Sequence, residues 1–295
     1  MTPIIEPDKD FEAVVRQTIS KQMLHRVSGA ELVQFKRDQG KQDLGFTSRP
    51  FVLCGLPLRR PAPGHLSYER RNGHFVLQVT GHPDYGLPFG QDRVVPIFLA
   101  TLAVRQQSQT IRFRTAAEML ETFGMHKSGK QYRRLVGAFE RVFGATIFFS
   151  TDTQLGTAKV IHTARFNFFR EAQIWYNRNS NNLPPSERFE NTIVLSDEFY
   201  RELMSHPIPT DLEAVRVLHN APGVLDLFVC LCYRCFCTKT EDQIPLFGTF
   251  GLANQLGSVE SRVRAGFAAS WRNGCESFPS FGQNAPLGSA PTGKP

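Results

Sequence analysis

The most constraining feature of this chain is a stretch at positions 128–143 that combines the apolar spacing of a helix with a strongly basic opposite side. Ser128 can act as the N-cap, and apolar residues then recur at the i, i+3, i+4, i+7 spacing of one buried stripe: Tyr132, Leu135, Val136, Phe139 and Phe143. Five basic residues accompany a single acidic one between positions 127 and 141. With a bare Gly137 on its solvent side, such a helix suits close approach to a phosphate backbone. A solvated basic surface explains an isolated helix of this kind equally well.

The overall composition favours a globular protein with acidic partners. The 295 residues are enough for two compact domains with extensions, and 41% of them are hydrophobic. The net charge of +7 and the pI of about 9.2 point to nucleic acid first, although a basic enzyme has the same composition. The first 25 residues contain Glu6, Asp8, Asp10 and Glu12 and lack a continuous apolar core, so no signal peptide is expected. No apolar run approaches the roughly 18 residues of a membrane span, so we expect a cytoplasmic protein.

Four of the six cysteines form a Cys-x-Cys-x-x-Cys-x-Cys pattern at positions 230–237, inside an apolar helical stretch. Reduced thiols are the default without secretory context. Four ligands within one helical segment point in different directions and cannot converge on a tetrahedral ion without breaking the helix. We therefore favour core thiols over a metal site, and we expect no metal and no cofactor.

The pattern from position 94 to 169 predicts a helix, a short strand, two helices and a hairpin. The expected helices are 94–107 (with Asp92 as cap), 115–123 and 128–143, and the expected strands are 110–113, 145–150 and 160–169. This order is the layout of a winged helix, in which the third helix enters the major groove and the hairpin grips the backbone. Gly124 ends the second helix, and the short link to Ser128 suits a helix-turn-helix corner. Lys159, His162 and Arg165 are expected to share one face of the second wing strand.

The region before position 94 is predicted to hold less regular structure. Positions 10–23 have the spacing of a short amphipathic helix. Positions 40–64 are rich in Gly and Pro and indicate a linker or loop, whose Arg59 and Arg60 either stay solvated or touch a phosphate backbone. Positions 66–69 and 74–80 predict a hairpin with Asn72-Gly73 as its two-residue turn.

A second set of elements repeats the first. Positions 223–236, 244–247, 250–256 and 258–271 mirror helix, strand, helix and helix, and the last of them carries Arg262 and Arg264. A strand at 191–195 and a helix at 197–204 precede this set. After Trp271 the chain is rich in Gly, Pro and Ser, with no two β-runs to build a wing. We therefore predict an α+β fold of two tandem winged-helix domains, the second with an incomplete or missing wing. The expected parts are an extension at 1–65, domains at 66–176 and 177–278, and a disordered tail at 279–295.

No constellation of catalytic residues stands out. Gly124 and Gly129-Lys130 match the start of a P-loop, but Gln131 replaces the magnesium-binding hydroxyl and a helix rather than a strand is expected before the loop. The eight histidines are never paired around one apolar residue as a rolling-circle nicking enzyme requires, and the Gly-x-Ser-x-Gly elbow of serine hydrolases is absent. We therefore expect no enzymatic activity, with an NTPase or nuclease acting on DNA as the rival from another class.

Two long segments resemble a known family. LPFGQDRVVPIFLATLAVRQQSQTIRF and AAEMLETFGMHKSGKQYRRLVGAFERVFGATI look like the RepA-type plasmid replication initiators, and GVLDLFVCLCYRCF with IPLFGTFGLANQLG is similar to the later part of that family. The resemblance implies tandem winged helices that bind direct repeats (iterons) in double-stranded origin DNA, melt adjacent A·T-rich DNA, and recruit the host initiator and replicative helicase. It also implies repression of the protein's own promoter, and plasmid copy control through a switch between monomer and homodimer.

The residues and the resemblance together nominate the DNA contacts. The candidates are polar and basic residues of the two recognition helices and the wing: Lys127, Ser128, Lys130, Gln131, Arg133, Arg134, Arg141, Lys159, His162, Arg165, Arg262 and Arg264. A transcriptional repressor that uses the same modules without a role in replication is the main alternative.

Overall fold

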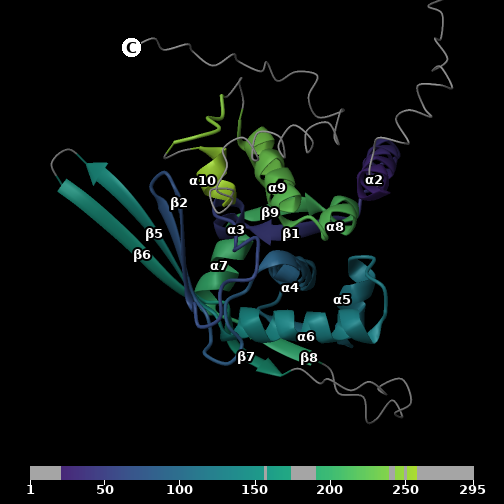
Figure 1. Ribbon diagram of the computed structural model, residues 1–295, viewed down its shortest axis with the longest axis horizontal. Coiled ribbons are helices and arrows are strands. Elements are labelled where there is room, and N and C mark those ends of the chain that lie inside the picture. The colour runs from purple at the N-terminus through teal and green to yellow at the C-terminus, as the bar shows by residue number, and fades with distance from the viewer. Residues whose placement is uncertain (1–20, 156–157, 174–190, 239–242, 249–250, 258–295) are drawn as a thin grey trace, which may run out of the picture.

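The computed structural model describes residues 21–155, 158–173, 191–238, 243–248 and 251–257 (Figure 1). Its helices are α2 (Lys21–Asp38), α3 (Arg49–Leu53), α4 (Val94–Gln106), α5 (Ala116–Thr122), α6 (Gly129–Gly144), α7 (Asp197–Ser205), α8 (Leu212–Leu218), α9 (Pro222–Cys237) and α10 (Leu252–Leu256), with a 3-10 helix, η1 (Gly90–Arg93). Its strands are β1 (Leu44–Ser48), β2 (Ser67–Asn72), β3 (Phe75–Thr80), β4 (Thr110–Phe113), β5 (Thr146–Leu155), β6 (Ala158–Asn167), β7 (Phe169–Gln173), β8 (Asn191–Leu195) and β9 (Pro207–Asp211). The protein is a mixed α/β fold with small sheets.

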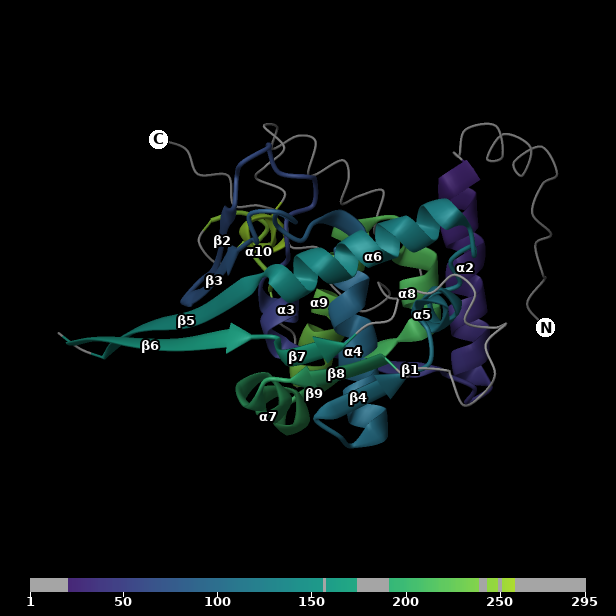
Figure 2. The ribbon, with the colours of Figure 1, turned by 90° about the horizontal axis from the view of Figure 1, so that it is seen from below.

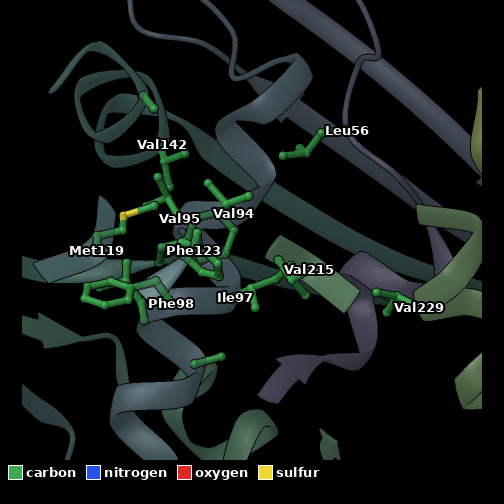
Figure 3. Close-up of a cluster of buried hydrophobic side chains, with 14 of the residues drawn as sticks. Leu56, Val94, Val95, Ile97, Phe98, Met119, Phe123, Val142, Val215 and Val229 are labelled. Atoms are coloured by element: carbon green, nitrogen blue, oxygen red, sulfur yellow. The ribbon is translucent and has the colours of Figure 1, made fainter. Parts of the chain in front are cut away.

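Helix α4 lies at the centre of the fold. Nine of its thirteen residues are buried, because apolar side chains occupy all of its sides rather than one stripe. The ring of Phe98 meets Phe113 of β4 and Phe123 after α5 edge-on, with centroids 5.6 and 6.2 Å apart. Figure 3 shows Val95 and Phe98 beside Met119, Phe123 and Val142. Burying each large apolar side chain contributes about 1.5–3 kcal/mol, so this cluster fixes α5 and α6 on α4.

The strands form three small antiparallel sheets. The largest has the order β2-β3-β5-β6, and its last two strands form a hairpin of ten-residue strands. Figures 1 and 2 show this hairpin as an arm that projects beyond the helices. The second sheet has the order β4-β8-β7, and the third pairs β1 with β9. Each of the two smaller sheets joins segments that lie far apart in the sequence.

Most of the elements expected from position 94 onward are confirmed, with ends shifted by a few residues. The hairpin before them is also confirmed, but its turn is Gly73-His74 because Asn72 pairs with Phe75. The wing strands are longer than expected, since pairing continues to Leu155 and Ala158. The expected cap of α4 is wrong. Asp92 instead accepts the backbone N–H of Phe89 at 2.9 Å and ends up in η1.

Two expectations outside this region are wrong. The stretch 40–64 is not a continuous loop, because β1 and α3 lie within it and bury Thr47 and Val52. No strand forms in the described residues 243–248. The expected helix at 10–23 falls almost wholly outside the described residues, and the expected helix at 258–271 and tail at 279–295 lie outside them entirely.

The division into two winged-helix domains stays a prediction. One hydrophobic core runs from Val33 of α2 to Val229 of α9, and the pairs β1–β9 and β4–β8 cross the boundaries expected at 65 and 176. The order helix, strand, helix, helix, hairpin is present between α4 and β6. In a winged helix the strand between the helices joins the wing, whereas β4 pairs here with β8.

Candidate nucleic-acid interface

Helix α6 starts at a capped corner. After α5 the chain turns at Gly124, whose φ of +60° lies in the left-handed region that glycine adopts at little cost. Ser128 then takes an extended conformation, and its hydroxyl accepts the backbone N–H of Gln131 at 3.2 Å. Such a cap contributes about 1 kcal/mol and sets where the helix begins. The Ser128 hydroxyl therefore caps α6 whether or not it also contacts DNA.

One stripe of α6 faces the core, as the spacing predicts. Leu135, Ala138, Phe139 and Val142 are buried, and the Phe139 ring stacks on Phe113 and on Phe143 with centroids 6.3 and 5.3 Å apart. Tyr132, Val136 and Phe143 are only half-buried at the edges of the stripe. Because these contacts fix the rotation of α6 about its axis, the opposite stripe is held toward solvent.

The N-terminal half of α6 presents three exposed cations, Lys130, Arg133 and Arg134. Within the part of the chain that the structure describes, none of the three has an ion-pair partner. Lys127, just before the helix, is exposed but forms an ion pair with Glu121. Half-buried Gln131 supplies its backbone N–H to the cap, which leaves its side chain as the candidate group.

The charge of Arg134 also acts on a neighbouring helix. Burial lowers the pKa of His219, at the end of α8; a hydrogen bond to the Arg216 carbonyl acts against this, and the nearby side chains of Arg134 and His25 lower the pKa further. The imidazole Nδ1 lies 2.6 Å from that carbonyl. The exposed end of α6 is thus electrostatically coupled to α8.

The C-terminal half of α6 is different. Arg141 donates two hydrogen bonds to the carboxylate of Asp92, at 2.6 and 2.9 Å, and its guanidinium lies 4.8 Å from the centre of the Phe89 ring. The Asp92 side chain is only 4% exposed and that of Arg141 19%. Arg141 is one of the predicted DNA contacts; because a buried carboxylate neutralises its charge, we now expect it to hold η1 rather than DNA. Gly137 leaves room for this pair, since a Cβ there would lie 3.1 Å from Arg141 Nη1.

The basic residues expected on the wing do not share one face. Lys159, His162 and Arg165 pair with Gln154, Thr151 and Phe148 in a hairpin whose register has no irregularity. In a regular strand, successive positions alternate between faces. A spacing of three therefore puts position 162 on the face opposite positions 159 and 165, which corrects the expectation. Arg262 and Arg264 lie outside the described residues.

A second buried ion pair joins the two halves of the chain. Arg93 of η1 lies 2.7 Å from Asp226 of α9, with the two side chains 6% and 11% exposed. Burial raises the pKa of Asp226, and the Arg93 guanidinium acts against that rise. Sequence reasoning missed both aspartates as partners, because nothing in a local pattern relates positions 92 and 141, or 93 and 226.

The cysteines do not assemble a site in the described residues. Cys54 and Cys230 are buried, whereas Cys235 and Cys237 are exposed. Burial raises the pKa of Cys54 to about 12, so its thiol stays protonated at neutral pH. No cluster of three or more His, Cys, Asp or Glu able to hold a metal ion occurs among the residues described. Over the same residues, no helix has both the length and the apolarity needed to cross a membrane.

Comparisons with known proteins identify the family. Two solved structures of domains 2 and 3 of RctB are similar to this chain. The first is 13% identical over 63% of this chain and 71% of the solved chain, with a TM-score of 0.45. The second is 12% identical over 77% of this chain and 79% of the solved chain, with a TM-score of 0.48. A search of curated proteins found no match. The sequence pattern of a family described as "Replication initiator protein A" matches residues 55–212, which is just over half of the chain and includes α4, α5, α6 and the projecting hairpin. The chain belongs to the replication initiator protein A family.

Proposed function

We propose that this replication initiator binds direct repeats in duplex DNA at a plasmid origin, with the N-terminal half of α6 as its reading surface. The observation that carries the proposal is the set Lys130, Arg133 and Arg134. These three cations are exposed and unpaired within the described residues, on a helix whose back is fixed in the core. Unpaired cations on a rigid helix can neutralise phosphates or donate to guanine without first breaking an ion pair.

The dimensions of α6 suit the major groove. Its sixteen residues span about 24 Å, and the groove is about 12 Å wide and admits one helix. In this arrangement Arg134 donates two hydrogen bonds to a guanine, a contact that discriminates against the wrong base by about 1–3 kcal/mol. Lys130 and Arg133 neutralise phosphates beside it, and the hairpin of β5 and β6 lies along the backbone. The winged-helix manner of binding is part of the proposal.

The direct test compares two variants on two DNAs. Arg134→Ala is expected to weaken binding to a duplex with the origin repeats about 5- to 150-fold, and to weaken binding to random duplex much less. Arg201→Ala is the matched control, because it removes an exposed arginine from α7, and α4 packs against both α6 and α7 (Figure 2). Equal losses on both DNAs would reduce Arg134 to a phosphate contact. Loss of binding in the control would refute the assignment of the surface.

The later steps of initiation belong to the same proposal. We propose that binding to the repeats promotes melting of adjacent A·T-rich DNA and recruits the host initiator and helicase, without a catalytic step by this chain. A purified sample that hydrolyses ATP or nicks supercoiled DNA would contradict the last point. A transcriptional repressor would use the same surface, so an origin plasmid that replicates only when the protein is supplied separates the two roles.

A further inference from the structure

A second pair of exposed arginines lies outside the candidate interface. Arg59 and Arg60 sit in the loop between α3 and β2, and both are exposed. Neither has an ion-pair partner in the described part of the chain. The sequence alone left two explanations open, a solvated loop or a contact with phosphate. The surroundings of the loop distinguish between these explanations.

The loop is fixed to η1 rather than free in solvent. The backbone N–H of Gly90 donates to the Pro57 carbonyl at 2.9 Å, and Arg93 Nη2 donates to the Leu56 carbonyl at 2.9 Å. Three prolines, at positions 57, 61 and 63, restrict the backbone of the loop further. A fixed loop loses little conformational entropy on binding, so a pair of cations on it is already arranged for a ligand.

Two aspartates at the contacts that fix this loop are already neutralised. Asp92 is paired with Arg141, and Asp226 with Arg93. Each aspartate therefore balances one arginine, buried Arg93 or half-buried Arg141, and neither is left to balance the charges of Arg59 and Arg60. A solvated face more often mixes both signs, whereas an unbalanced cationic site favours an anion.

The loop also lies at the edge of the face that α6 presents. Arg141 is seven residues after Arg134 and hence on the same stripe of the helix, and its guanidinium reaches Asp92 of η1. The chain of contacts from Arg141 to Asp92, and from Gly90 to Pro57, places the loop beside the C-terminal end of α6. Lys130 and Arg141 are about 16 Å apart along the helix, more than the width of the major groove of about 12 Å.

We propose that Arg59 and Arg60 form a second phosphate-binding site, which holds the DNA backbone beyond the C-terminal end of α6. The site rests on the proposed function, because it needs the N-terminal half of α6 to lie in the groove. It contributes affinity and register without reading bases, since phosphate contacts carry no sequence information. It would also explain why the C-terminal half of α6 needs no free cation of its own.

The test measures how the affinity for origin duplex depends on salt. Each phosphate contact contributes about 0.9 to the slope of log K against log salt concentration, so Arg59→Ala/Arg60→Ala should make the slope shallower by about 1.8. Between 50 and 200 mM salt, the double variant should then lose about twelve-fold less affinity than the wild type. The ratio of affinities for repeat and random duplex should not change. Arg59→Lys/Arg60→Lys keeps both charges and should keep the slope. Arg201→Ala, the control, should also leave the slope unchanged.

Trimming the duplex locates the site. When base pairs are removed from the flank next to the C-terminal end of α6, the wild type and the alanine double variant should show the same salt slope. When the other flank is trimmed, their slopes should still differ. If the alanine double variant keeps the wild-type slope, or if the lysine double variant loses as much slope as the alanine one, the inference is overturned. The binding role of α6 stays intact in either case. A wild-type protein that binds no duplex would refute the proposed function itself.

Discussion

The two halves of α6 carry similar cations that are put to different uses. Lys130, Arg133 and Arg134 at the N-terminal half are exposed and unpaired among the described residues, whereas Arg141 is held by buried Asp92 and the face of Phe89. Both sets lie on the side of the helix away from the core. The difference shows that a basic stripe on a helical wheel counts charges without showing which of them are available to a ligand.

The largest expected difference between the two halves of α6 is in the free energy of unfolding of Arg141→Ala and Arg134→Ala. Removal of the guanidinium leaves the Asp92 carboxylate buried without its partner, which costs about 3–5 kcal/mol of the free energy of unfolding. Arg134→Ala should change that free energy by less than about 0.5 kcal/mol, because its side chain is exposed. Urea denaturation of the two variants measures both values. Similar losses in the two variants would show that the halves of α6 do not differ as described.

The second test measures DNA binding, for which we expect the change at Arg134 to have a larger effect than the change at Arg141. Arg134→Ala should lose about 1–3 kcal/mol of binding to the repeat duplex. Arg141→Lys keeps a cation opposite Asp92 but cannot form the two-bond pair, so it should lose stability while the folded fraction binds DNA like the wild type. The affinities of both variants for the repeat duplex are measured at a temperature where both are fully folded, and are compared with that of the wild type. A specific binding defect in Arg141→Lys would return Arg141 to the interface.

The start of α6 offers a smaller effect on both properties. Ser128→Ala removes the acceptor of the Gln131 N–H and should cost about 1 kcal/mol in stability. Ser128→Asp keeps a capping oxygen and should recover that stability, while its negative charge should weaken DNA binding. Thermal denaturation and binding on the two variants separate the cap from the interface. Full binding by Ser128→Asp would place DNA further from this corner.

The smallest expected effect is on the pH dependence of stability, through His219. His219 has a lowered pKa in the folded protein. Between its ordinary pKa of 6.5 and the lower folded pKa, the unfolded state therefore binds more protons than the folded state. The stabilisation is therefore complete above pH 6.5 and is lost as the pH falls toward the folded pKa. His219→Asn should remove this part of the pH dependence of unfolding.

The same histidine reports on the two halves of α6. Arg134→Ala removes a nearby positive charge and should raise the pKa of His219, whereas Arg141→Lys should leave it unchanged. An NMR titration of the His219 ring measures both shifts. No shift in Arg134→Ala would mean that the guanidinium does not point toward α8.

Local patterns in the sequence determined the positions of α4, α6, the β2–β3 hairpin and β8, because helical and strand periods are properties of a few consecutive residues. They also placed the buried stripe of α6 and its cap. The same strand period puts His162 on the face opposite Lys159 and Arg165, so the sequence contains what is needed to assign that face. Family resemblance predicted the replication initiator family, which the match over residues 55–212 confirms.

Only the tertiary structure decided which charges and strands are paired. Arg141 meets Asp92 across 49 positions, β4 pairs with β8 across the domain boundary expected at 176, and β1 pairs with β9 across both expected boundaries. Such choices depend on which surfaces the packed core brings together, and a local pattern carries no record of them. For the same reason the sequence leaves two explanations open for Arg59 and Arg60, and only the folded protein, which places their loop beside aspartates that are already neutralised, favours the phosphate contact.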